Sequence, residues 1–261
     1  MKNVRIERRD EGLAILRLDK ERGNAIDEAL VEDLVEAAAD LETDGGVRGV
    51  LLASAHPNLF CPGLDLIGLR DYDRPALARF LGKFAQAVWA LYGMNKPLVA
   101  ALSGHAVAGG CVLALTADWR VLRRGGVNIG LNEIRVGVPL PWSVAVLLRA
   151  TVSPERASGI ALLGRNFADE AALGAELAHE LAPAEGFEEA CLARLREFAD
   201  KDPAAFATTK RYLRGDALAS MQAREKELET DFLDAWFSAP TQARIRATIK
   251  SLGKRRNRSG S

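Results

Sequence analysis

The chain has 261 residues, of which 48% are hydrophobic, so it can form one large domain or two small ones around a sizeable core. Lysine plus arginine and aspartate plus glutamate number 35 each, and this balance gives no long-range attraction to nucleic acid or to an anionic membrane. The three cysteines, Cys61, Cys111 and Cys191, lack the spacing of metal ligands and indicate a reduced compartment rather than a disulfide framework.

The two ends of the chain and its apolar runs bear on its location. Residues 1–12 contain no apolar stretch of the kind that marks a secretory signal. No apolar run reaches the roughly 18 residues needed to cross a bilayer, and the final Arg-Ser-Gly-Ser is not a peroxisomal address. We therefore expect a cytoplasmic protein with neither a membrane nor a nucleic acid as its partner.

The predicted elements begin with a β-hairpin. Residues 4–8 and 13–18 alternate apolar and polar side chains around a turn at residues 10–12. Apolar residues then recur at helical spacing over residues 30–41, and Asp27 is the expected N-cap of that helix.

Strands and helices alternate in the next part of the chain. A strand is predicted at residues 47–54, a helix at residues 74–91 and a buried strand at residues 98–102. This order predicts an α/β fold with parallel strand pairing and right-handed crossovers. Beyond Glu133 the pattern becomes helical, with helices predicted from Ser153-Pro154 and at residues 167–174, 185–200, 202–214, 218–237 and 242–252.

A pair of glycines stands out in the segment 98–120, LVAALSGHAVAGGCVLALTADWR. Gly109 and Gly110 follow a predicted strand and precede a segment, residues 112–116, that could begin a buried helix. Adjacent glycines let the backbone approach another group closely, and the free N–H groups at a helix start favour negative charge. The pair predicts a cradle for an anion or a developing oxyanion; the alternative is a tight turn that packs a helix on a strand.

Two more segments favour the interpretation of the glycine pair as an anion cradle over the tight turn. They are NLFCPGLDL at residues 58–66 and NIGLNEIRVGVP at residues 128–139. In this order, the three segments resemble the crotonase superfamily, the enoyl-CoA hydratase/isomerase family. The resemblance implies an α/β fold, the ClpP/crotonase-like spiral of ββα units with a C-terminal helical region. We expect residues 1–195 to form the spiral core and residues 196–261 a helical trimerisation region. The assembly implied is a homotrimer or a dimer of trimers.

The resemblance also implies the residues of the active site. It places two backbone N–H donors, those of Leu64 and Gly109, around the carbonyl oxygen of an acyl-CoA thioester, and it assigns proton transfer to Glu133. Gly63, Leu64, Asp65 and Leu66 are the implied contacts to coenzyme A. Coenzyme A enters as part of the substrate, so no permanently bound cofactor is expected. The scattered histidines, His56, His105 and His179, predict no metal site.

One position distinguishes the reactions of the family. Hydratases use two glutamates to hold the water that adds to the double bond, and the first lies three residues beyond the second N–H donor. Here that position is Val112, which has no proton to transfer. A single carboxylate suits a Δ3,Δ2-enoyl-CoA isomerase, in which Glu133 removes a proton from C2 and returns it at C4. Burial in apolar surroundings would raise its pKa and make it a better base.

Several alternatives remain open. The chain could be an enoyl-CoA hydratase of fatty-acid β-oxidation, or a hydrolase or decarboxylase of the same fold, with Asp71 or Asp73 as a second acid. Those aspartates could instead cap the helix that begins near Pro75. A non-catalytic or RNA-binding member of the superfamily is a third possibility. Lys210 and Lys254 could contact coenzyme phosphates, and the basic run 254–258 could be a solvated tail.

Overall fold

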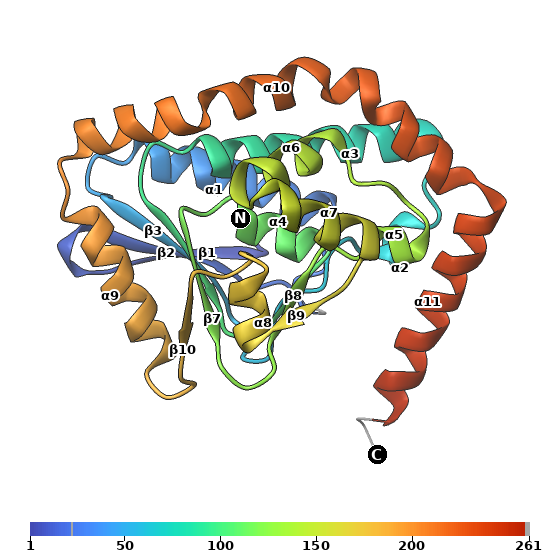
Figure 1. Ribbon diagram of the computed structural model, residues 1–261, viewed down its shortest axis with the longest axis horizontal. Coiled ribbons are helices and arrows are strands. Elements are labelled where there is room, and N and C mark those ends of the chain that lie inside the picture. The colour runs from blue at the N-terminus through green and yellow to red at the C-terminus, as the bar shows by residue number, and fades with distance from the viewer. Residues whose placement is uncertain (22, 259–261) are drawn as a thin grey trace.

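The computed structural model describes residues 1–21 and 23–258, with side chains to residue 251. A twisted sheet crosses the molecule, with helices on both of its faces (Figure 1). Its spatial order is β1 (Val4–Arg8), β2 (Leu13–Leu18), β3 (Gly49–Ser54), β5 (Leu98–Leu102), β7 (Trp119–Arg123) and β10 (Glu180–Ala182). The hairpin β1–β2 is antiparallel, and every later pairing in this sheet is parallel.

A smaller sheet lies beside the first, in the order β4 (Leu59–Cys61), β6 (His105–Val107), β8 (Asn128–Gly130) and β9 (Phe167–Ala168). Along the chain, β3, β5 and β7 of the large sheet are each followed by one strand of the small sheet and then by a helix. The helices that follow β4, β6 and β8 are α2 (Leu66–Leu69), α4 (Gly109–Leu115) and α5 (Glu133–Val136). The chain therefore has the spiral of ββα units that the sequence resemblance implied.

The large sheet is buried on both faces, which explains its nearly continuous apolar strands. One set of alternating residues, including Leu16, Leu52 and Leu122, faces the main core, which also contains residues of α1 (Glu28–Thr43) and α3 (Arg74–Gly93). The other set, including Ile15, Leu51 and Val121, packs against α9 (Phe187–Ala199).

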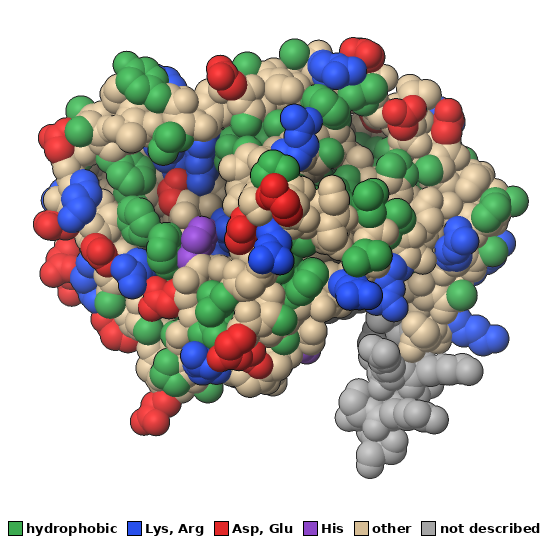
Figure 2. Space-filling model, viewed as in Figure 1, with side chains coloured by type: hydrophobic (Ala, Val, Ile, Leu, Met, Phe, Trp, Pro, Cys, Tyr) green, Lys and Arg blue, Asp and Glu red, His purple; other side chains and the backbone are tan. Residues whose placement is uncertain are grey.

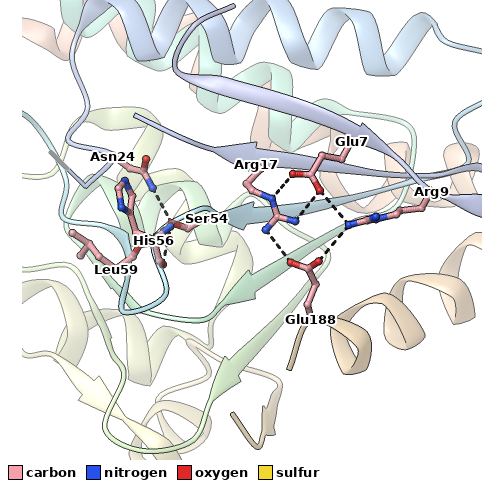
Figure 3. A network of polar contacts seen from close by, with 8 residues as sticks. All are labelled: Glu7, Arg9, Arg17, Asn24, Ser54, His56, Leu59 and Glu188. Carbon is pink, nitrogen blue, oxygen red and sulfur yellow. Dashed lines mark hydrogen bonds and ion pairs between the residues drawn. The ribbon is translucent and has the colours of Figure 1, made fainter. Parts of the chain in front are cut away.

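Ion pairs fasten the hairpin to α9. Figure 3 shows Arg17 between two carboxylates: its Nε lies 2.6 Å from Oε1 of Glu7, and its Nη1 lies 2.9 Å from Oε2 of Glu188. Arg9 contacts the same two glutamates at 3.2 and 3.6 Å. The hydrogen bond from Arg17 lowers the pKa of Glu7, and this network ties a strand of the sheet to the helix that covers it.

The C-terminal part of the chain wraps around the core. Helix α10 (Pro203–Phe237) lies across α3 and also contacts α6 (Trp142–Thr151), and α11 (Ala239–Arg258) then turns down one side of the molecule (Figure 1). The prediction of two helices at 202–214 and 218–237 is wrong, since α10 is continuous. A single glycine costs a helix only about 1 kcal/mol, and the packed neighbours on either side of Gly215 override that preference.

Other predicted elements need smaller corrections. The helix expected at 167–174 is divided into β9 and α8 (Asp169–Gly174), and β10 was not predicted. The pairing partner of β10, β7, lies about 60 residues earlier in the chain, so local pattern alone does not reveal such a short strand. Helix α7 (Pro154–Leu163) begins after Ser153 as expected, but the Ser153 hydroxyl donates to Glu176 instead of capping the helix.

Acidic and basic side chains are interspersed over the face of the molecule in Figure 2, as the equal numbers of the two charges suggest. In the described part of the chain, no helix combines the length and the apolar composition that a membrane crossing requires.

Candidate active site

The smaller sheet brings three distant segments together. Its parallel strands β4, β6 and β8 lie side by side, and the segment after each strand leaves from the same edge of the sheet. Leu64 follows β4, Gly109 follows β6 and Glu133 follows β8. The three residues that the sequence resemblance singled out therefore share one end of the sheet, the usual place for a site in a parallel fold.

The backbone of Leu64 is held so that its N–H group is free. Ile26 and Leu64 form a parallel bridge: Ile26 N–H donates to Gly63 O at 2.9 Å, and Asp65 N–H donates to Ile26 O at 2.8 Å. In this geometry the N–H of Leu64 points away from Ile26, and no backbone acceptor takes it within the described residues. It is available to a ligand.

The N–H of Gly109 lies next to it. Gly109 is the first residue of α4, and its N–H likewise has no backbone acceptor within residues 1–21 and 23–258. A Cβ built on Gly63 would lie 3.1 Å from Gly109 N, and one built on Gly109 would lie 3.3 Å from Gly63 Cα. The two loops are thus in backbone contact, which explains why glycine occupies both positions.

Asn24 supports this arrangement and was not identified as a site residue from the sequence. It is buried, and its side-chain amide donates to Ser54 Oγ at 2.9 Å (Figure 3). The same amide donates to Phe60 O at 2.8 Å, and Asn24 Oδ1 accepts from Lys20 N–H. These bonds join the loop before Ile26 to β4, and Ile26 in turn holds Leu64. The two acceptors of the Asn24 amide are 30 and 36 residues away along the chain, so the local sequence does not reveal this role.

Ala108 has a strained backbone directly before Gly109. Its φ is 49° and its ψ is −126°, a combination that glycine adopts easily and alanine rarely. The Ala108 N–H donates to Gly130 O at 2.8 Å, and its carbonyl accepts from Val112 N–H at 3.0 Å. These two bonds hold the strained residue in place and thereby aim the first N–H of α4.

Ala108→Gly is expected to raise the free energy of unfolding by about 1 kcal/mol, because glycine relieves strain of about 1–3 kcal/mol and loses part of that gain to chain entropy. Urea denaturation measures the change. Ala219→Gly, in the exposed middle of α10, is the control, and it should lower stability by about 1 kcal/mol. Equal destabilisation by both substitutions would contradict the interpretation of strain.

Glu133 supplies the ionisable group of the site. The residue as a whole is partly exposed, but its carboxylate oxygen Oε2 is fully buried and has no hydrogen-bond partner in the described structure. Burial raises the pKa of Glu133 to about 7. The carboxylate also raises the pKa of the Cys111 thiol, second to burial itself, which places Glu133 close to α4.

The other acidic candidates have structural roles. Asp73 caps α3 by accepting from Ala76 N–H at 2.8 Å, while Asp71 is an exposed partner of Arg70. Asp65 caps α2 by accepting from Ile67 N–H and Gly68 N–H, and contact with coenzyme A remains a prediction for it. Val112 is 1% exposed within the main core, so the position that carries the first glutamate in hydratases is apolar and buried here.

Lys210 and His105 have hydrogen-bond partners within the protein. Lys210 is buried, and its Nζ pairs with Asp118 Oδ2 at 2.6 Å, so the suggestion that it meets coenzyme phosphates is wrong. His105 is exposed, and its Nδ1 accepts from Asn128 N–H at 2.9 Å. The side chains of Lys254 and of the run 254–258 lie outside the described residues.

The chain is similar in sequence and in structure to known proteins. The family model for enoyl-CoA hydratase/isomerase matches residues 8–255. The chain belongs to this family. The sequence resemblance to the crotonase superfamily, the enoyl-CoA hydratase/isomerase family, is therefore confirmed, and this family acts on coenzyme A thioesters.

Relatives of both kinds occur within the enoyl-CoA hydratase/isomerase family. "Enoyl-CoA delta isomerase 1, mitochondrial" of Rattus norvegicus is 33% identical over 70% of this chain and 64% of its own length, so the match spans less than two thirds of that protein. "Probable enoyl-CoA hydratase EchA17" of Mycobacterium tuberculosis is 35% identical over 77% of this chain and 76% of its own. The crystal structure of human mitochondrial delta3-delta2-enoyl-CoA isomerase superposes with a TM-score of 0.93, at 25% identity, over 97% of this chain and 99% of that one.

Proposed function

We propose that this protein is a Δ3,Δ2-enoyl-CoA isomerase in which Glu133 alone transfers the proton. The supporting observation is the Glu133 carboxylate, whose Oε2 is buried without a hydrogen-bond partner among the described residues, at the same end of the small sheet as the two free backbone N–H groups of Leu64 and Gly109. It is combined with valine at position 112, where a hydratase has its other glutamate. The match to the human isomerase structure over nearly the whole chain agrees with this proposal.

The mechanism follows from the properties of these groups. The thioester oxygen accepts hydrogen bonds from Leu64 N–H and Gly109 N–H, which makes the C2 proton more acidic. Ionised Glu133 removes that proton, and the N–H groups stabilise the negative oxygen of the dienolate; each donor typically contributes about 3 kcal/mol at the transition state. The protonated Glu133 then delivers its proton to C4, and the double bond has moved from C3–C4 to C2–C3 with no net gain or loss of atoms.

A hydratase is the second candidate, because the mycobacterial relative named a probable hydratase is as similar in sequence as the rat isomerase. The two activities are separated by incubating the protein with 3-hexenoyl-CoA and, separately, with crotonyl-CoA. We expect 2-hexenoyl-CoA from the first and little 3-hydroxybutyryl-CoA from the second. Rapid hydration without isomerisation would overturn the proposal.

The pH dependence of isomerisation follows from the pKa of Glu133. A base must be ionised to accept a proton, and burial raises this pKa to about 7. We expect kcat/KM for 3-hexenoyl-CoA to rise with pH through a midpoint near 7. A midpoint near the ordinary glutamate pKa of 4.5 would contradict Glu133 as a buried base.

We propose that the protein assembles as a homotrimer or a dimer of trimers, with residues 196–261 contributing to assembly. Large apolar side chains are unusually exposed on α10 and α7: Tyr212 is 77% exposed, Leu213 80% and Leu162 69%. Such side chains are typical of interfaces between subunits. Sedimentation equilibrium tests the proposal, and the mass of a single chain at micromolar concentration would refute it.

A further inference from the structure

Helix α5, which begins with Glu133, is too short to hold its own position. It is a single turn, and its N-cap, Asn132, makes no side-chain capping bond. One turn of helix is unstable without tertiary contacts. The direction in which Glu133 points is therefore determined by the elements that pack around α5, which include α7 and α11.

Gly137 ends this helix in the left-handed conformation, with a φ of 95°. The hydroxyl of Thr241, in the first turn of α11, donates to Gly137 O at 3.0 Å, and Thr241 is 2% exposed. A Cβ built on Gly137 would lie only 2.7 Å from that hydroxyl oxygen. The contact leaves no space for another group between α5 and α11.

A second glycine, at the end of helix α7, also packs against α5. Gly164, the C-cap of α7, is also left-handed, and a Cβ built on it would lie 2.8 Å from Ile134 Cγ2. Helix α5 is thus packed between the end of α7 and the start of α11. Of these two contacts, the one from Thr241 is a hydrogen bond with a defined direction.

The carboxylate of Glu133 depends on this support. Its Oε2 has no partner in the described part of the chain, so no side chain fixes the orientation of the carboxylate. The ionisable groups near α5 include Cys111 from α4, Arg135 on α5 itself and Arg244 from α11, and none of these three forms an ion pair with Glu133 among the described residues. Only the path of the α5 backbone and its packing place the base.

We propose that Thr241 is a positioning residue for Glu133: its hydrogen bond to Gly137 fixes the backbone of α5 and keeps α11 packed against the helix that carries the base. The inference rests on the proposed function, because it takes Glu133 as the base. It also gives the C-terminal helix a role in proton transfer in addition to the role in assembly.

The test replaces Thr241 by valine, which has nearly the same shape and lacks the hydroxyl. We expect kcat for 3-hexenoyl-CoA to fall about 10-fold or more, with KM changed less than about threefold, because geometry at the base is lost and thioester binding is kept. Water reaching Glu133 should also move the midpoint of the pH–rate profile from near 7 towards 4.5. Thr241→Ser retains the hydroxyl and should restore both values.

Thr248→Val is the matched control, since Thr248 lies on the same helix and donates only to Arg244 O within α11. It should leave kcat and the pH profile unchanged. Equal effects of the two valine substitutions, or an unchanged profile in a folded Thr241→Val protein, would overturn the inference. Thr241→Ala is measured in parallel, so that poor folding of the valine variant does not decide the result.

A Glu133→Gln protein, assayed beside these variants, separates the two proposals. If it keeps full activity, the proposed function fails. If it is inactive while Thr241→Val behaves like the unmodified protein, only the positioning role of Thr241 fails.

Discussion

Glu133→Gln is expected to lower the rate of 3-hexenoyl-CoA isomerisation by about 10²–10⁴-fold, the usual effect of losing a general base. Glutamine preserves the shape of the side chain but cannot accept the proton from C2. Binding of the acyl-CoA should persist, because Leu64 N–H and Gly109 N–H come from the backbone. Steady-state kinetics gives the rate, and calorimetric titration with a non-isomerisable acyl-CoA gives the affinity. Glu36→Gln, on the exposed side of α1, is the control and should have no effect.

The same variant should be more stable than the unmodified protein at high pH. The pKa of Glu133 is about 7 in the folded state, compared with 4.5 for an ordinary glutamate, so the folded state disfavours the ionised form. This penalty is absent below pH 4.5, grows as the pH rises, and is complete above about 7. A shift of this size corresponds to about 3 kcal/mol. We expect Glu133→Gln to unfold at higher urea concentration at pH 8 and to show no such gain at pH 4.

Either of two results would contradict this assignment. Isomerisation at an undiminished rate by folded Glu133→Gln would show that another group transfers the proton. A rate loss that is matched by an equal loss of acyl-CoA affinity would show that Glu133 contributes to binding rather than to proton transfer.

Gly109→Pro is expected to abolish measurable isomerisation, because proline has no N–H to offer the thioester oxygen. The loss of one such donor typically lowers kcat by about 10²–10³-fold. Gly109 is the first residue of α4, a position at which proline is compatible with a helix. Turnover is measured together with circular dichroism, which reports whether the helices are retained.

Gly109→Ala is the matched comparison, since alanine retains the N–H. Its Cβ would lie 2.8 Å from Cδ1 of Ile26, the flexible end of a side chain, and 3.3 Å from Gly63 Cα. We expect a much smaller loss, about 10-fold or less. If the alanine and proline variants lose activity equally, crowding at this position explains the effect and the N–H donor does not.

Local sequence pattern was sufficient for much of the fold. The hairpin, the buried strand at 98–102, the cap Asp27 and the parallel order were all predicted correctly. Short elements whose stability comes from distant partners were missed, as β10 shows, because their own residues carry little signal. The continuous α10 was divided wrongly for a related reason: Gly215 weakens the local helical pattern, and tertiary packing restores it.

Identification of the site depended on a different kind of information. Leu64, Gly109 and Glu133 were chosen from the family resemblance, and the structure brings their segments to one edge of the small sheet. Supporting residues such as Thr241 could not be found in this way. The partner of Thr241 is 104 residues earlier in the chain, and a threonine near the start of a helix looks the same in sequence whether or not it holds a distant loop.

The spiral separates the groups of the site onto different turns, since Leu64, Gly109 and Glu133 each follow the second strand of a separate ββα unit. The chemistry is therefore modular. Since two of the groups are backbone N–H donors, the oxyanion site that we propose can be inherited unchanged while the side chains around it vary. On the proposed mechanism, exchanging the acid–base residues on one turn, as at position 112 on the turn that carries α4, would alter the reaction and leave the remaining turns intact. A single scaffold can in this way diversify its reactions one turn at a time.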